Sequence, residues 1–205
     1  MIEQLSEEWF KARLGKVTAS KVKDVMAKTK SGPAATRTNY MMELLCQRLT
    51  GNREESFTSA AMQRGTDLEP IARMAYELES GNHVTEAEFI VHSEYSAMGA
   101  SPDGFVENDG LIEIKCPNTA KHLACIQSDM YDKQYYPQMQ FQMACTGRKW
   151  CDFVSFDDRL PDELQLFVCR VERSEHYING MIDEVIRFLA ELLKLEIEMR
   201  ERMVK

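Results

Sequence analysis

Two carboxylates and a lysine lie close together in the middle of the chain, at a spacing suited to phosphodiester hydrolysis. Asp103 follows Ser-Pro, and Glu113 and Lys115 alternate with Ile112 and Ile114 on a predicted strand. Alternation places Glu113 and Lys115 on one face and the isoleucines on the core face. Two neighbouring acids need a cation between them, and oxygen ligands suit magnesium or manganese, while a lysine can orient or help deprotonate the bound water. A surface salt bridge is the alternative interpretation, but the wider sequence context favours catalysis.

A tight hairpin is predicted to bring these three side chains to one side of a sheet. A three-residue loop ending in glycine, Asn108-Asp109-Gly110, keeps Asp103 on the face of Glu113 and Lys115, whereas a two-residue loop would reverse it. The pairs expected across this hairpin are Glu107 with Leu111, Phe105 with Glu113, and Asp103 with Lys115.

Hydrophobic periodicity and turn residues predict helices and strands in alternating groups. Helices are expected from about Arg37 to Thr50, about Ser59 to Ser80, over most of Lys121 to Gly147, and from about Glu175 to Lys205. Pro137 fits only near a helix start or a kink. Strands are expected at Val84 to His92, Ala100 to Glu107, Leu111 to Lys115, Trp150 to Phe156 and Leu164 to Val171, with a loop at Ser31 to Ala34. This order predicts a mixed β-sheet flanked by helices, of α/β or α+β class.

Length and composition predict a single domain spanning residues 1–205, with the last helix, about 175–205, packed on it or at a subunit interface. No apolar run approaches the roughly 20 residues of a membrane span, and the acidic N-terminus lacks the apolar core of a secretory signal. The six cysteines show no C-x-x-C spacing, which favours reduced thiols over zinc ligands or disulfides. We therefore expect a cytoplasmic protein that contacts no membrane, in the host cytoplasm if it is phage-encoded.

The formal net charge of −8 argues against a protein that coats nucleic acid through a uniformly basic surface. A nuclease remains compatible, because it needs positive charge only where phosphates lie. A basic segment near the N-terminus is either a DNA-facing patch or an ordinary solvated helix face. Its members are Lys11, Arg13, Lys16, Lys21, Lys23, Lys28 and Lys30.

Pro102-Asp103 followed by Glu113-Ile114-Lys115 matches the PD-(D/E)-x-K nuclease pattern. The wider sequence resembles one branch of that superfamily, the lambda-type phage exonucleases or YqaJ-like viral recombinase family, and this resemblance implies a restriction-endonuclease-like core. It covers about Trp9 to Met143. The blocks that carry it, besides the central motif with Ser101 and Cys116-Pro117, are Trp9 through Arg13-Leu14-Gly15 to Thr18-Ala19-Ser20, then Arg64-Gly65-Thr66-Asp67-Leu68-Glu69, and the weaker Gln138-Met139-Gln140-Phe141.

The resemblance implies a metal-dependent active site. Asp103, Glu113 and the backbone carbonyl of Ile114 would bind Mg²⁺, with Mn²⁺ as a substitute and two ions expected per site. Lys115 matches the motif lysine, and Glu69 matches a further acid that completes the metal and water shell. By residue type alone Glu69 is equally a solvated helix glutamate.

The resemblance also implies a pocket for a 5′-phosphate, matched by Arg13, Ser20 and Ser101, with Lys30 on a basic loop near the duplex end. A guanidinium binds phosphate through paired hydrogen bonds, and hydroxyls add further ones. Ser20 could instead be a helix N-cap, and Lys30 an ordinary surface lysine.

The resemblance also implies site roles for one residue in the weaker block and for one residue just before it. Gln138 matches a glutamine that contacts the reacting region, and Tyr135 matches a tyrosine one turn earlier. This sequence departs from the family pattern there, because Pro137 separates the two residues and Tyr136 competes with Tyr135.

The implied activity is 5′-to-3′ digestion of one strand of linear double-stranded DNA from 5′-phosphorylated ends, leaving 3′ tails for recombination by strand annealing. The family further implies a ring-shaped homotrimer and a single-strand annealing protein as partner. An endonuclease of the same fold is the first alternative, and a catalytically silent DNA-binding module is the second. Cleavage of a closed circle would favour the endonuclease, and a missing acid or lysine would have favoured the silent module.

Overall fold

The computed structural model describes residues 6–30, 32–53 and 59–202, which form three sheets and seven α-helices. The helices are α1 Glu7–Arg13, α2 Val22–Val25, α3 Ala35–Thr50, α4 Ala60–Ser80, α5 Thr119–Ser128, α6 Tyr136–Thr146 and α7 Glu175–Arg202. Short 3₁₀ turns lie at Ala19–Lys21, Lys133–Tyr135 and Asp162–Leu164. No helix within these ranges has the length and apolar character of a membrane span.

The largest sheet has five strands in the order β10-β9-β8-β7-β4. Its strands β8 and β9 run parallel, and the other neighbours run antiparallel. The strands are β10 Leu166–Glu172, β9 Trp150–Phe156, β8 Gly110–Lys115, β7 Gly104–Val106 and β4 Val84–Thr85. A three-stranded sheet contains β1 Val17–Thr18, β6 Met98–Ala100 and β5 Ile90–Val91, and a small hairpin pairs β2 Lys28–Thr29 with β3 Gly32–Pro33.

Helices cover both faces of the five-stranded sheet, so the predicted mixed α/β fold is confirmed. On one face, Ala72 and Tyr76 of α4 pack against Ile112 and Ile114 of β8. On the other face, residues of α5 and α6 pack against β8, β9 and β10. Because a strand alternates its side chains, β8 serves two cores, and its polar residues must lie on the α6 side.

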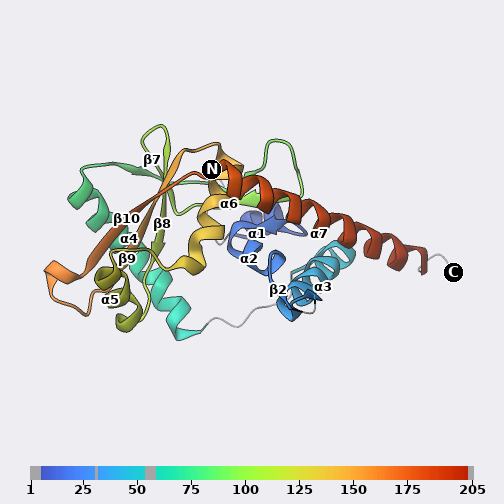
Figure 1. Cartoon of the computed structure of the whole chain (residues 1–205), viewed down its shortest axis with the longest axis horizontal. Coiled ribbons are helices and arrows are strands. Elements are labelled where there is room, and N and C mark those ends of the chain that lie inside the picture. The colour runs from blue at the N-terminus through green and yellow to red at the C-terminus, as the bar shows by residue number, and fades with distance from the viewer. Residues whose placement is uncertain (1–5, 31, 54–58, 203–205) are drawn as a thin grey trace.

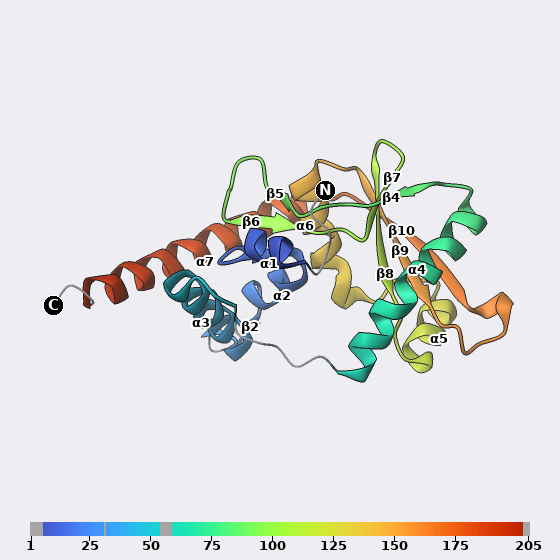
Figure 2. The ribbon, with the colours of Figure 1, turned by 180° about the vertical axis from the view of Figure 1, so that it is seen from behind.

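A third core joins the N-terminal segments to the C-terminal helix. Figures 1 and 2 show α7 running beside α3 and away from the large sheet. The helices α1, α2 and α6 lie between α3 and that sheet. Five residues of α7 at helical spacing are buried, which explains the amphipathic pattern of this helix. They are Ile178, Met181, Val185, Phe188 and Leu192, and they pack in a cluster with residues of α2, α3 and β6.

Most predicted elements are confirmed, with ends that differ by a few residues. Helices α3, α4 and α7 and strands β8, β9 and β10 lie where periodicity placed them, and both α3 and α4 end at a left-handed glycine. The predicted helical region up to Gly147 contains α5 and α6, and Pro137 lies in the first turn of α6 as expected. The predicted loop is instead the β2–β3 hairpin, with Ser31 outside the described residues.

Two predicted strands are wrong, because each is divided between two sheets. Val84 to His92 contains β4 in the large sheet and β5 in the small one. Ala100 to Glu107 contains β6 and β7, separated by Ser101, Pro102 and Asp103. Proline has no N–H to donate to a ladder, so the strand is interrupted there and the chain crosses from one sheet to the other.

The central hairpin has the predicted three-residue loop, but its position is wrong by one residue. The loop is residues 107–109, Phe105 pairs with Leu111, and Gly110 is the first residue of β8. Glu107, at the first position of the loop, takes the left-handed conformation with φ of 48°. Gly110 is required in the strand because the Trp150 ring covers the space a β-carbon would fill. The register moves by two positions, so the predicted face of each residue is unchanged.

Candidate active site

Strand β8 presents Glu113 and Lys115 side by side beneath α6. Glu113 is completely buried, and its carboxylate forms an ion pair with the ammonium of Lys115. Both residues lie at the carboxyl end of β8, where the chain leaves the sheet at Cys116. The predicted proximity of this acid and this lysine is thus present in the structure.

Two glutamines of α6 hold the carboxylate of Glu113. Gln138 donates from Nε2 to Oε1 at 2.5 Å, and Gln142 donates from Nε2 to Oε2 at 2.6 Å. The two glutamines are four residues apart on one face of the helix, so both amides reach the same carboxylate. A buried carboxylate needs such partners, since an unpaired one would carry a large desolvation cost. Sequence reasoning predicted Gln138 and missed Gln142.

Asp103 lies in the bend between β6 and β7, directly beside β8. Its Oδ2 accepts a hydrogen bond of 2.6 Å from the backbone N–H of Ile114, which fixes the carboxyl group next to the Glu113-Ile114-Lys115 segment. Arg73 of α4 donates to the backbone carbonyl of Asp103 at 3.1 Å. The structure therefore joins the two halves of the predicted motif through a hydrogen bond between the Asp103 carboxylate and the backbone of β8.

Glu69 approaches the same cluster from α4. Its carboxylate pairs with Arg73 at 3.3 Å, and its pKa is raised by burial, against the opposing charges of Arg73 and Lys115. The negative charge of Glu113 adds to the rise of this pKa. Glu69 is thus half-buried, with Arg73 linking its helix to Asp103.

The cluster has the electrostatics expected of a site for a hard cation. Burial raises the pKa of Asp103 well above its ordinary value, and the charge of Glu113 raises it further. Burial lowers the pKa of Lys115, but Glu113 and Asp103 outweigh burial and hold it above its ordinary value. The described residues contain no group of three or more His, Cys, Asp or Glu side chains in metal-binding arrangement. The available donors are two carboxylates and the carbonyl of Ile114, an all-oxygen set that fits magnesium.

Arg13 and Ser101 meet, although they are far apart in the sequence. Arg13 donates from Nη1 to Ser101 Oγ at 3.1 Å, and Trp9 donates from Nε1 to the same oxygen at 2.9 Å. The guanidinium lies 3.9 Å from the centroid of the Trp9 ring. Burial lowers the pKa of Arg13 to about 10, so the group stays charged at neutral pH. Trp9, the first residue of the N-terminal sequence block, thus orients this pair.

Arg13 lines a cavity of about 870 Å³ between the N-terminal segment, α3 and the start of α4. Ser20 is exposed in the 3₁₀ turn and also lines the cavity, as do Lys16 and Lys21. The N-cap positions around Ser20 belong to Thr18 and Lys21, so the alternative capping role is wrong. Lys30 is exposed in the β2–β3 turn and does not line the cavity.

Tyr135 lies against the active-site lysine from the start of α6. The Nζ atom of Lys115 is 5.2 Å from the centroid of the Tyr135 ring, which also stacks on Phe153 at 5.8 Å. Tyr136 turns the other way and packs on Tyr131 and Tyr177. The structure therefore places Tyr135, not Tyr136, beside the predicted catalytic residues.

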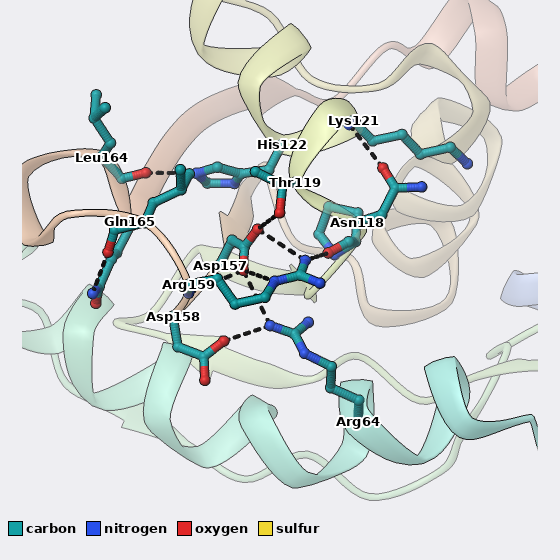
Figure 3. Close-up of polar contacts among 12 residues, drawn as sticks. Arg64, Asn118, Thr119, Lys121, His122, Asp157, Asp158, Arg159, Leu164 and Gln165 are labelled. Carbon is teal, nitrogen blue, oxygen red and sulfur yellow. Dashed lines mark hydrogen bonds and ion pairs between the residues drawn. The ribbon is translucent and has the colours of Figure 1, made fainter.

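A second polar cluster, centred on Asp157, ties the segments around the site together (Figure 3). The fully buried carboxylate of Asp157 accepts hydrogen bonds from Arg64 at 3.1 Å, from Arg159 at 2.7 Å and from Thr119 at 2.6 Å. Arg159 also donates to the carbonyl of Pro117 at 3.3 Å. Asp157 thereby joins α4, the segment that follows Lys115 and the end of β9. Nothing in the sequence marked it.

Comparison with solved structures identifies the fold. The chain is 55% identical to an alkaline exonuclease from Laribacter hongkongensis, with 97% of this chain and 98% of that chain covered and a TM-score of 0.90. The same enzyme in complex with dAMP matches with a TM-score of 0.91. A phage-related exonuclease from Haemophilus somnus, 18% identical over 92% of this chain and 96% of that chain, shares the fold with a TM-score of 0.69. The protein therefore has the fold of the alkaline exonucleases.

The sequence match is more specific than the fold. Residues 8–149 match the YqaJ-like viral recombinase domain, and no curated protein matches the chain. The protein belongs to the YqaJ-like viral recombinase family, which confirms the resemblance carried by the sequence blocks.

Proposed function

We propose that this protein is a magnesium-dependent 5′-to-3′ exonuclease that digests one strand of linear duplex DNA and leaves 3′ single-stranded tails. The observation that carries the proposal is the hydrogen bond between Arg13 and Ser101. Ser101 is two residues from Asp103, so a terminal phosphate bound at Arg13 would lie next to the carboxylate cluster. That arrangement suits an enzyme that recognises a strand end and cuts beside it.

The relatives support the same activity. The structures that are 55% identical over nearly the whole chain are of an alkaline exonuclease, and one of them contains dAMP. A nucleoside monophosphate is the product expected when an exonuclease removes one residue at a time. The described residues here keep both acids and the lysine of the motif, so a silent module has no support.

Each polar residue has a defined task in this proposal. Asp103, Glu113 and the carbonyl of Ile114 would hold magnesium, which polarises the phosphate and lowers the pKa of the attacking water. Lys115, charged at neutral pH, would donate hydrogen bonds to that water or to a phosphate oxygen. Gln138 keeps the carboxylate of Glu113 in place.

The deciding experiment compares DNA ends. Purified protein with magnesium is incubated with linear duplexes bearing a 5′-phosphate or a 5′-hydroxyl, labelled at either terminus, and with a closed circle. We expect mononucleotide release from the 5′-phosphorylated end, slower release from the hydroxyl end, an intact circle, and no reaction with a chelator. Cleavage of the circle would instead indicate an endonuclease of the same fold.

The family membership also supports a homotrimer and a single-strand annealing partner. Light scattering of the purified protein should give three times the mass of the 23.6 kDa chain. A monomeric mass at working concentration would remove the trimer from the proposal while leaving the nuclease activity to be judged by cleavage.

A further inference from the structure

Gly65 lies inside α4, where no contact among the described residues requires a glycine. Its backbone is ordinary α-helix, and a β-carbon built on it meets no atom of the described residues within 4 Å. Glycine in a helix interior destabilises the fold relative to alanine. Gly110 is different, because the ring of Trp150 occupies the space beside it. Gly65 therefore lowers stability with no return in packing or conformation.

The position of Gly65 on the helix relates it to the active site. Residues four apart lie on one face of a helix, so Gly65 is directly in line with Glu69. Arg73 donates to the carboxylate of Glu69 and to the backbone carbonyl of Asp103, which connects Glu69 to the carboxylate cluster. Its neighbour Thr66 lines the cavity that contains Arg13. The bare helix surface at Gly65 thus lies between the cavity and the carboxylate cluster.

The helix cannot easily move away from whatever passes over that surface. Arg64, the residue before Gly65, is bound to the buried carboxylate of Asp157 and to Asp158, which attach this part of α4 to the end of β9 (Figure 3). A side chain added at Gly65 would therefore project into the space in front of the helix rather than displace the helix.

We propose that Gly65 keeps the surface of α4 bare for the sugar–phosphate backbone of the DNA strand that is being digested. Glycine is the residue that lets another backbone approach a helix most closely. The proposal rests on the proposed nuclease function and adds to it the path of the substrate, from the Arg13 cavity past Gly65 to Glu69. A second copy of the chain could also cover this surface, and the experiment below distinguishes it from DNA.

The test uses Gly65→Ala and Gly65→Leu, with Gly180→Ala and Gly180→Leu as matched controls. Gly180 is likewise a helix glycine with nothing within 4 Å of its built β-carbon, but it is exposed and lies in α7, whereas Gly65 is half-buried. Both alanine variants should raise the unfolding midpoint by about 2–4 °C, since each removes a helix glycine. Gly65→Leu should weaken binding of a short 5′-phosphorylated duplex, measured in a chelator, by about tenfold or more, and should slow its digestion in magnesium. The Gly180 variants should bind and cut as the wild type does.

Three results would separate the outcomes. A folded Gly65→Leu variant that binds and cuts the duplex like the wild type would overturn the inference. A changed mass by light scattering, with duplex affinity unaltered, would overturn it in favour of a subunit contact. Selective loss of duplex binding in a protein whose wild type cuts no DNA would uphold the path of the strand and refute the nuclease proposal.

Discussion

At the scale of single residues, the carboxylate of Glu113 is held on both of its oxygens. It is completely buried, paired with Lys115, and held through one oxygen by Gln138 and through the other by Gln142. The Oε1 atom of Gln142 is buried without a hydrogen-bond partner in the described residues. A helix that buries an unpaired amide oxygen in order to hold a carboxylate indicates that the orientation of this carboxylate matters.

Gln142→Ala should therefore reduce magnesium-dependent cleavage, because Glu113 loses the partner of its second oxygen. Loss of a residue that orients a metal ligand typically weakens metal affinity or activity by about 10–100-fold. Activity is measured against magnesium concentration, and we expect a higher half-saturating concentration.

The control for this prediction is Gln140→Ala in the same helix. Gln140 is equally buried but donates to the carbonyl of Glu172 and accepts from the N–H of Ser174. Its loss should lower the melting temperature and leave the magnesium dependence unchanged. Equal magnesium curves for Gln142→Ala and the wild type would remove Gln142 from the site.

Lys115→Ala should abolish most cleavage while the protein stays folded. The ammonium is held charged by Glu113 and Asp103, so its removal takes away the cation of the proposed site. A fall in turnover of about 10²–10⁴-fold is expected for such a group. Turnover is measured on a 5′-phosphorylated duplex, and retained turnover in this variant would contradict the assignment of the whole cluster.

At the scale of elements, the site depends on segments that the Asp157 cluster joins. Arg64, Thr119 and Arg159 come from α4, from the start of α5 and from the loop after β9, and all bind one carboxylate. Burial raises the pKa of Asp157, but hydrogen bonds from Arg159 and Thr119 outweigh burial and hold it well below its ordinary value. The ionised carboxylate therefore stabilises the folded state.

The lowered pKa of Asp157 makes the stability of the folded protein depend on pH. A depressed pKa contributes stability that is present above the ordinary value of about 4 and is lost as pH falls toward the pKa of the folded state. Asp157→Asn should lower the free energy of unfolding by about 2 kcal/mol at neutral pH. Thermal unfolding across pH should show the two proteins converging below about pH 4. A constant difference at every pH would mean that the Asp157 charge is not responsible.

The elements also show what the sequence could and could not predict. Helices α3, α4 and α7 were predictable because each carries a long periodic pattern. The shared face of Glu113 and Lys115 was predictable because the two residues alternate with isoleucines on one strand. The position of the loop was not predictable, because local turn rules favour Gly110 as a loop residue, whereas the structure places Glu107 in the loop and Gly110 in β8. Gln142 and Asp157 were missed because their roles come from partners remote in the sequence.

At the scale of the whole molecule, a net charge of −8 coexists with a basic cavity. Lys16, Lys21 and Arg13 line the cavity between the N-terminal segment and α4, whereas Lys149 pairs with Asp109 at the start of β8. Since Lys115 lies at the other end of β8, Lys149 is remote from the proposed DNA path. Charge is thus separated in space, which allows an acidic protein to bind a polyanion locally.

The dependence of duplex binding on salt should follow that separation. If Lys16 contacts a phosphate, Lys16→Gln should reduce the slope of log affinity against log salt by about one. Lys149→Gln, with the same change in net charge, should leave the slope unaltered. Anisotropy titrations of a labelled duplex at several salt concentrations measure both, and equal slopes for the two variants would show that total charge, not position, governs binding.

The packing of α7 on the N-terminal segments sets a limit on when the protein can act. The cluster that includes Val17 and Ala19, beside the Arg13 cavity, also contains Phe188 and Leu192 of α7. A ribosome must therefore have synthesised and released residue 192 before that cluster can close. The N-terminal segments that line the Arg13 cavity therefore gain their final packing only after α7 has been made.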